Sequence, residues 1–198
     1  MARSTSARRL GRILALLKDE MTWAWSALEV ARALEQRHDP AQASGLSAFI
    51  HRAARQEAIL SASRLISSDQ ESVTLHYLMD HVRHHPQIFR GASPGELDRL
   101  LARWDQDWLE WREFATRLRA YRDRRLAHLD RKALNEPEAF SSIEISLEDL
   151  SGLLEFVQDQ VGAIYGLYHN KQLDLQPLRE EIGRAAGCLA VHLHARDL

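Results

Sequence analysis

The chain has 198 residues, 45% of them apolar, and a formal net charge of −2. This length suits one domain with a substantial core and is too short for two domains to be the default expectation. The balance of 26 basic and 28 acidic residues argues against tight, indiscriminate RNA binding. No apolar run approaches the ~20 residues of a membrane span, and charged residues interrupt the stretch where a signal peptide would lie.

The composition is that of a helical protein in a reducing compartment. Ala, Leu, Arg, Glu and Gln are abundant, the chain has only 9 Gly and 5 Pro, and no run of alternating β-branched residues occurs. The single cysteine, Cys188, excludes an intramolecular disulfide, and we expect it to be buried and inert in an apolar helical stretch. The sequence thus predicts one all-α domain, residues 1–198, that is cytoplasmic, unprocessed and not membrane-bound.

Three helices are predicted in the first part of the chain. Apolar residues that recur every three or four positions predict a first helix from about Ser6 to His38, which ends at Pro40. A second helix is expected over residues 46–66. Its apolar residues include Leu46 and Phe49, and it also carries several small residues that permit close helix approach. A third, shorter helix is expected over residues 72–84, before the next proline blocks its continuation.

The third predicted helix carries a histidine cluster. His76, Asp80 and His84 stand at i, i+4 and i+8, on one helical face. His81 and His85 form a second pair at i and i+4. Paired histidines at this spacing can bind zinc or another transition metal when further ligands come from elsewhere, but no such ligand pattern accompanies them. Histidines near a helix C-terminus are also favoured by the helix dipole. We therefore expect no metal, and a bundle that binds metal through His76 and His84 stays an alternative.

The clearest helix start in the sequence follows. Ser93 serves as the cap, Pro94 takes the first helical position and Glu96 completes a capping box. Apolar residues then keep the helical period from Leu97 to Tyr121, which predicts one long helix. We expect its tryptophans in the core or at a dimer surface rather than in a platform for stacking bases. These are Trp104, Trp108 and Trp111.

Two further helices complete the predicted bundle. Residues 134–142 contain Pro137 and show no clear period, so we expect a loop that emerges beside the end of the long helix. Ser146 caps a fifth helix with a broad apolar face, and Pro177 opens a sixth. The chain is therefore expected to fold as an up-and-down bundle of about five to six helices, with one long helix.

Positive charge gathers at the end of that long helix. From Arg112 to Lys132, eight basic residues oppose three acidic ones, which gives a local charge of +5 in a chain of net −2. Arg122 and Asp123 lie in this span and are followed by His128. Guanidinium groups bind phosphate oxygens and imidazole titrates near neutrality, so the combination suits chemistry on phosphate esters. The same pattern also fits a solvated helix face with local ion pairs and a structural histidine.

The run Arg-Asp-Arg-Arg-Leu-Ala-His-Leu-Asp over residues 122–130 resembles the signature of the HEPN superfamily, in which Arg, a polar residue, four further residues and His follow one another. It looks most like the abortive-infection branch of the AbiU type. A looser likeness over residues 63–75 extends the resemblance to roughly residues 45–170. HEPN proteins are helical dimers and very often metal-independent ribonucleases. The resemblance therefore implies a homodimer that cleaves RNA without a cofactor, in phage defence or as a toxin.

Residue roles follow from the motif. Arg122 is expected to hold and neutralise the phosphate, His128 to transfer protons as the 2′-hydroxyl attacks, and Asp123 to orient either group. Residues six apart on a helix differ by about 120° in direction and about 9 Å along the axis, so a second copy is expected to complete the site across a two-fold axis. The candidates for contacts to the RNA backbone are Arg124, Arg125, Arg131 and Lys132.

One departure from the family pattern bears on regulation. Some HEPN toxins carry a tyrosine two residues after the histidine as an acceptor for inactivating nucleotide transfer, whereas this chain has Asp130 there. Control of that kind is not expected, and the sequence identifies no antitoxin or other defence partner. The competing hypothesis is a catalytically silent HEPN-like module that dimerises or binds a ligand within a defence system.

Overall fold

The computed structural model describes residues 5–37, 45–68, 72–89, 91–93, 95–127 and 144–197. These residues form six α-helices, one 3-10 turn and no strand, which confirms the predicted all-α fold. The elements are α1 (Thr5–Glu35), α2 (Gly45–Ile66), α3 (Leu75–His84), η1 (Pro86–Ile88), α4 (Glu96–Ala127), α5 (Leu147–His169) and α6 (Gln176–Asp197).

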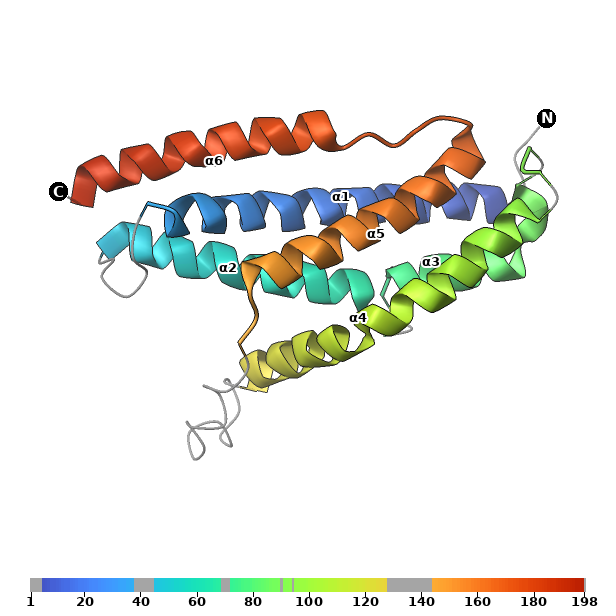
Figure 1. The fold of residues 1–198 in the computed structure, drawn as a ribbon, viewed down its shortest axis with the longest axis horizontal. Coiled ribbons are helices and arrows are strands. Elements are labelled where there is room, and N and C mark those ends of the chain that lie inside the picture. The colour runs from blue at the N-terminus through green and yellow to red at the C-terminus, as the bar shows by residue number, and fades with distance from the viewer. Residues whose placement is uncertain are drawn as a thin grey trace.

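The helices form an up-and-down bundle (Figure 1). Helix α1 runs away from the N-terminus and α2 returns along it, with α3 continuing in the direction of α2. Helices α4, α5 and α6 then alternate in direction, and α5 crosses in front of α1 and α2 in this view. The predicted architecture with one long motif-bearing helix is present, because α4 spans 32 residues and its C-terminal turns carry Arg122 and Asp123.

Helix α1 supplies the centre of the core. Its apolar residues recur every three or four positions, so one face of the helix is covered by neighbouring helices along its whole length. The same cluster of buried side chains includes residues from α2, α3, α4 and α5, which explains why these elements pack around α1. The largest fully buried side chains of α1 are Leu10, Leu17, Met21, Trp25, Leu28 and Leu34.

The first two turns of helix α2 leave their large apolar side chains exposed. Leu46 and Phe49, which the sequence places among the apolar residues of this helix, are 52% and 62% exposed. The buried residues of this first turn and a half are instead Ser47, Ala48 and His51. Farther along, α2 buries Ile59, Leu65 and Ile66 together with several alanines and serines, whose small side chains let two helix backbones approach closely.

The predicted cap of α4 is present, although the helix begins later than expected. The backbone N–H and the hydroxyl of Ser93 both donate to the carboxylate of Glu96, at 3.0 and 2.8 Å. These hydrogen bonds lower the pKa of Glu96. Gly95 adopts a positive φ of 77°, which is incompatible with a regular helix, so α4 starts at Glu96, and Pro94, the predicted first helical position, lies outside the described residues.

Helix α6 packs against the bundle through a narrow stripe of buried residues. The prediction that Cys188 is buried is wrong. The buried residues of α6 include Ala186, Ala190 and Leu193, and Cys188 lies on the exposed side. Positions two residues apart on a helix differ by about 200° in direction, so Cys188 faces away from the side on which Ala186 is buried.

None of the helices in the described ranges combines the length and apolar character needed to cross a membrane.

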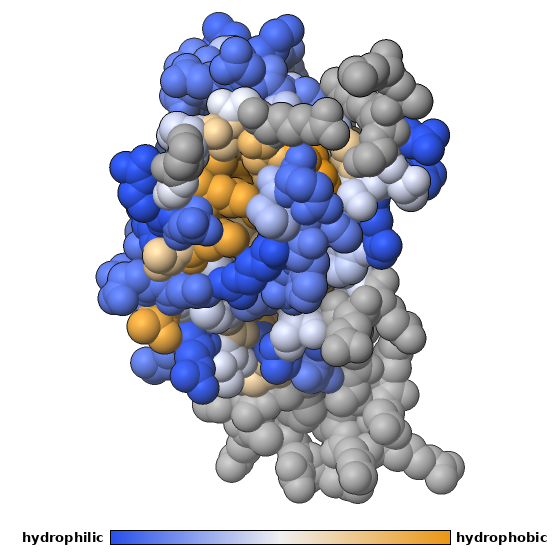
Figure 2. Space-filling model, turned by 90° about the vertical axis from the view of Figure 1, so that its right-hand side faces the viewer, coloured by the Kyte–Doolittle hydropathy of each residue, from blue (hydrophilic) through white to orange (hydrophobic). Residues whose placement is uncertain are grey.

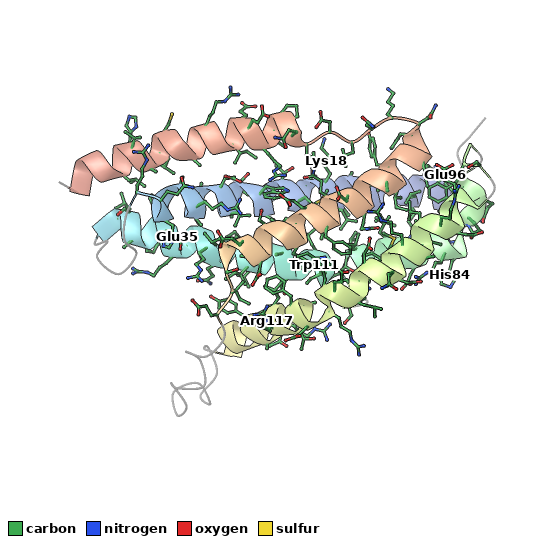
Figure 3. The ribbon with its side chains drawn as sticks, viewed as in Figure 1. Lys18, Glu35, His84, Glu96, Trp111 and Arg117 are labelled. Carbon is green, nitrogen blue, oxygen red and sulfur yellow. The ribbon has the colours of Figure 1, made fainter. Side chains whose placement is uncertain are left out.

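An aromatic layer joins α4 to α5. Trp104 is 3% exposed and stacks on Phe156 with ring centroids 5.5 Å apart. Trp108 stacks on Trp104 at 5.4 Å, and Trp111 stacks on the same phenylalanine at 5.9 Å. Figure 3 shows Trp111 between the two helices. The tryptophans are therefore core residues that fix α4 against α5, as the helical spacing predicted.

Candidate functional site

The candidate site lies near the C-terminal end of α4, beside the end of α2. Arg122 reaches across to α2, where its Nη1 lies 3.5 Å from the hydroxyl of Ser67. Arg119, one turn earlier on α4, donates from Nη2 to the hydroxyl of Ser68 at 2.6 Å. Consecutive serines at the end of one helix thus hold two guanidinium groups of another, which places these groups side by side.

Asp123 fixes the orientation of Arg122. The Nε and Nη2 groups of Arg122 donate to the same carboxylate oxygen of Asp123, at 2.9 and 2.8 Å. The Arg122 side chain is 26% exposed and that of Asp123 is 56% exposed, so the pair sits at the surface with one edge toward solvent. A guanidinium carries five N–H donors, and two of those on Arg122 have no acceptor among the described residues. These donors are available to the oxygens of a phosphate group.

Several residues of the predicted site lie outside the described part of the chain. The backbones of Arg124 and Arg125 continue α4, and their side chains are not described. His128, Arg131 and Lys132 lie outside the described residues, as do Asp130 and the expected loop over residues 134–142. The structure therefore brings Arg122 and Asp123 together.

The residues that hold the two arginines in place were not predicted from the sequence. Ser67 and Ser68 fall within the looser HEPN likeness over residues 63–75, and Arg119 lies in the basic span, but none of the three was assigned a role. A signal was present in the spacing, because Arg119 and Arg122 stand at i and i+3 and so share a helix face. Which residues of α2 meet that face depends on tertiary packing, which local spacing does not determine.

The histidines of α3 take part in packing and local hydrogen bonds. His76 presents its ring edge-on to Trp108, with centroids 4.4 Å apart. His81 Nε2 lies 3.2 Å from the carbonyl oxygen of Ser6, and His84 Nδ1 lies 2.7 Å from the carbonyl oxygen four residues earlier. Within the described ranges, no three His, Cys, Asp or Glu side chains are grouped so that they could hold a metal ion. The alternative of a metal-binding bundle gains no support from these residues.

Three histidines make the fold sensitive to acid. Burial lowers the pKa of His51, His76 and His81, and for His76 the charges of Arg119 and Arg83 add to this effect. A group with a lowered folded-state pKa binds more protons when unfolded, so its contribution to stability is complete above the unfolded pKa of about 6.5. That contribution is lost as the pH falls through the folded-state pKa.

We therefore expect urea denaturation to give a lower free energy of unfolding at pH 5.5 than at pH 7.5, with the loss growing as the pH decreases further. His76→Gln removes one of the responsible groups and should reduce this pH dependence. His84→Gln, which replaces an exposed histidine of the same helix, should reduce it less. Equal pH dependence in all three proteins would show that protonation of His76 does not contribute.

A cavity elsewhere on α4 is separate from this site. It has a volume of about 580 Å³ and opens between the start of α4 and the end of α5, where Leu100, Ala163 and Leu167 are among its lining residues. Figure 2 looks onto this end of the bundle and shows an apolar area surrounded by hydrophilic side chains. At 1.5 Å of rise per residue, Leu100 and Arg122 are about 33 Å apart along α4, so the cavity lies near the opposite end of the helix.

Comparison with known families supports the resemblance drawn from the motif. The sequence model of the AbiU2 family of HEPN proteins matches residues 8–186, which include the motif, the four complete helices α2 to α5 and most of α1. The match is longer than the span over which the motif alone indicated a likeness. No curated protein and no solved structure shows a significant similarity to the chain.

Proposed function

Because the chain belongs to the AbiU2 family of HEPN proteins, we propose that it is a metal-independent endoribonuclease that acts as a homodimer in phage defence or as a toxin. The observation that carries this proposal is the position of Arg122, which is held by Asp123 and Ser67 and keeps two N–H donors for an anion. In this proposal residues 1–198 form one HEPN-like domain. A core shared by α1 to α5 supports that assignment.

The proposed reaction needs proton transfer and stabilisation of an anion. A base removes the proton of the ribose 2′-hydroxyl, the 2′-oxygen bonds to phosphorus, and the bond from phosphorus to the 5′-oxygen breaks as that oxygen is protonated. The products are a 2′,3′-cyclic phosphate and a 5′-hydroxyl. His128 transfers the protons near neutral pH, and Arg122 neutralises the crowded phosphorane. Asp123 keeps the guanidinium in position through its two short hydrogen bonds.

The substrate in this proposal is held by the basic residues around the motif. Arg124 and Arg125 precede His128 by four and three residues and contact the RNA backbone from its side of the helix. Arg131 and Lys132 add contacts after it. A second copy of the chain completes the site across a two-fold axis, because Arg122 and a group six residues later point in directions about 120° apart on a regular helix.

The test is cleavage of total cellular RNA by the purified protein in EDTA, with wild type compared with His128→Ala. We expect wild type to cut and to leave 2′,3′-cyclic phosphate ends, because no metal takes part. His128→Ala should stay folded and dimeric and lose activity, since proton transfer by a positioned side chain contributes about 10²–10⁴-fold. A wild-type protein that binds RNA and forms dimers without cutting it would favour the catalytically silent module instead.

Mixing two inactive variants tests the composite site. Chains that carry Arg122→Ala and chains that carry His128→Ala are each expected to be inactive as homodimers. In a mixed dimer, one chain keeps the arginine and the other keeps the histidine, so a site shared by the two chains should regain part of its activity. If the mixture stays inactive although native mass spectrometry shows mixed dimers, each chain must use its own Arg122 and His128.

A further inference from the structure

Three arginines follow one edge of α4 toward the motif. They are Arg112, Arg119 and Arg122, which we call the basic ridge. At 3.6 residues per turn the three positions fall within about 80° of arc, and they are separated by about 10 Å and about 4.5 Å of rise. Arg112 and Arg119 are exposed, and Arg122 is partly covered by the end of α2.

The positive charge of Arg119 has no acidic partner in the described ranges. Its guanidinium meets the hydroxyl of Ser68, and no carboxylate of those ranges lies within ion-pair distance. Two other arginines of α4 do form ion pairs: Arg117 pairs with Asp149 at 3.7 Å, and Arg103 pairs with Asp107 at 3.3 Å. Within the described ranges, Arg119 therefore carries an unneutralised positive charge next to the guanidinium of Arg122.

The serine pair holds two like charges close together. Ser67 and Ser68 bind Arg122 and Arg119 on adjacent turns of α4, and the carboxylate of Asp123 on Arg122 offsets only part of the repulsion between the two guanidinium ions. An anion bound against both groups removes that repulsion and accepts charge-assisted hydrogen bonds. Two adjacent guanidinium groups with a net positive charge, followed by the exposed Arg112 along the same edge, offer charge-assisted contacts to successive phosphates.

We propose that the basic ridge binds single-stranded RNA, with Arg119 on the phosphate next to the one held by Arg122 and the strand continuing toward Arg112. The assignment of the scissile phosphate to Arg122 rests on the proposed function, whereas binding along the ridge does not. Trp104 is buried, and Trp108 and Trp111 are partly buried in the aromatic layer with Phe156, so none of the three presents a fully open ring face beside the ridge. Recognition along the ridge therefore acts through phosphates and tolerates different base sequences.

The test is binding of a fluorescent 2′-O-methyl RNA strand, which lacks the nucleophile for cleavage, to the full chain, measured by anisotropy at several salt concentrations. Arg119→Ala should weaken binding about tenfold. It should also reduce the slope of log K against log salt by about 0.7, the value for one phosphate contact on a single strand. Arg119→Lys keeps the charge and should retain the slope with a smaller loss of affinity.

Two further variants make the result specific. Arg103→Ala removes an exposed arginine of the same helix about 160° away from Arg119 and should change affinity less than twofold. Ser68→Ala removes the hydroxyl that fixes the guanidinium and should weaken binding by less than Arg119→Ala does. The proposal is overturned if wild type does not bind the strand, if Arg119→Ala matches Arg103→Ala, or if duplex RNA binds more tightly than the single strand.

The proposal for RNA binding along the ridge and the proposal for RNA cleavage can be contradicted independently. If Arg119→Ala weakens binding but no form of the protein cuts RNA, the ridge is supported and the nuclease proposal is not. If wild type cuts RNA and Arg119→Ala does so with unchanged KM and kcat, the nuclease proposal is supported and the ridge is overturned. Thermal melting of each variant checks folding, and no large change is expected because Arg119 is exposed.

Discussion

Arg122→Ala is expected to slow single-turnover RNA cleavage by about 10²–10³-fold, the cost of removing one donor that stabilises a developing oxyanion. The guanidinium is held by the carboxylate of Asp123 and the hydroxyl of Ser67 before substrate arrives, so little reorganisation is needed during the reaction. Arg122→Lys restores a positive charge without the planar fork that spans these two partners. We expect Arg122→Lys to cleave RNA at least tenfold more slowly than wild type, because an ammonium group cannot contact Asp123, Ser67 and the phosphate in the same arrangement.

Asp123→Asn distinguishes a positioning role from a catalytic one. If Asp123 only orients Arg122, replacing its charge should lower kcat less than Arg122→Ala does, and the pH profile of the rate should keep its shape. If Asp123 instead acts on the imidazole or transfers a proton, the pH profile should shift and the loss should equal that of Arg122→Ala. The hydrogen bonds of 2.8 and 2.9 Å from Arg122 to Asp123 favour the first outcome.

The sequence predicted the helices well because their signals are local. Caps and apolar periods act over a few residues, so the long helix was expected with its motif near the C-terminal end, and the contact of Ser93 with Glu96 is present. Its start was misplaced by a backbone detail, the positive φ of Gly95. The resemblance to the AbiU type of HEPN proteins was also local, since it came from nine residues, 122–130, and a looser likeness over residues 63–75.

The features that the sequence did not predict depend on distant contacts. Arg119 meets Ser68 across 51 positions and Arg122 meets Ser67 across 55, and no periodicity records such pairs. Phe49 is exposed because α2 approaches its neighbours through small residues, although hydrophobicity alone favours its burial. Cys188 is exposed for a related reason, since α6 is attached by a narrow stripe that includes Ala186. Composition indicates that a core exists, whereas the packing distances decide which residues form it.

The contact that sets the distance between α4 and α5 should be sensitive to one methyl group. A Cβ added at Gly152 would lie 2.9 Å from Cη2 of Trp111, closer than side-chain carbons approach in folded proteins. The indole of Trp111 cannot turn away freely, because it stacks on the Phe156 ring and meets the Phe114 ring edge-on, with centroid distances of 5.9 and 6.0 Å. Substitution at Gly152 must therefore displace the aromatic layer or separate the helices.

Gly152→Ala is expected to be about 2 kcal/mol less stable than Gly162→Ala, the matched change ten residues later in the same helix. Both substitutions gain about 1 kcal/mol of helix propensity. A Cβ at Gly162 meets nothing within 4 Å, so Gly162→Ala should be more stable than wild type, whereas overpacking in Gly152→Ala should offset the gain. Urea denaturation of the three proteins measures the difference directly.

A double-mutant cycle identifies the cause of the difference. Trp111→Phe removes the outer ring that contains Cη2, so the space needed by the new methyl group becomes available. Trp111→Phe should then lower the free energy of unfolding of Gly152→Ala by less than it lowers that of wild type, with a coupling free energy of about 1 kcal/mol or more. If Gly152→Ala proves as stabilising as Gly162→Ala, the aromatic layer yields without cost, and the separation of α4 from α5 must be set elsewhere. With coupling present, Gly152 is the residue that lets α4 pack close enough to α5 for Trp111 to stack on Phe156.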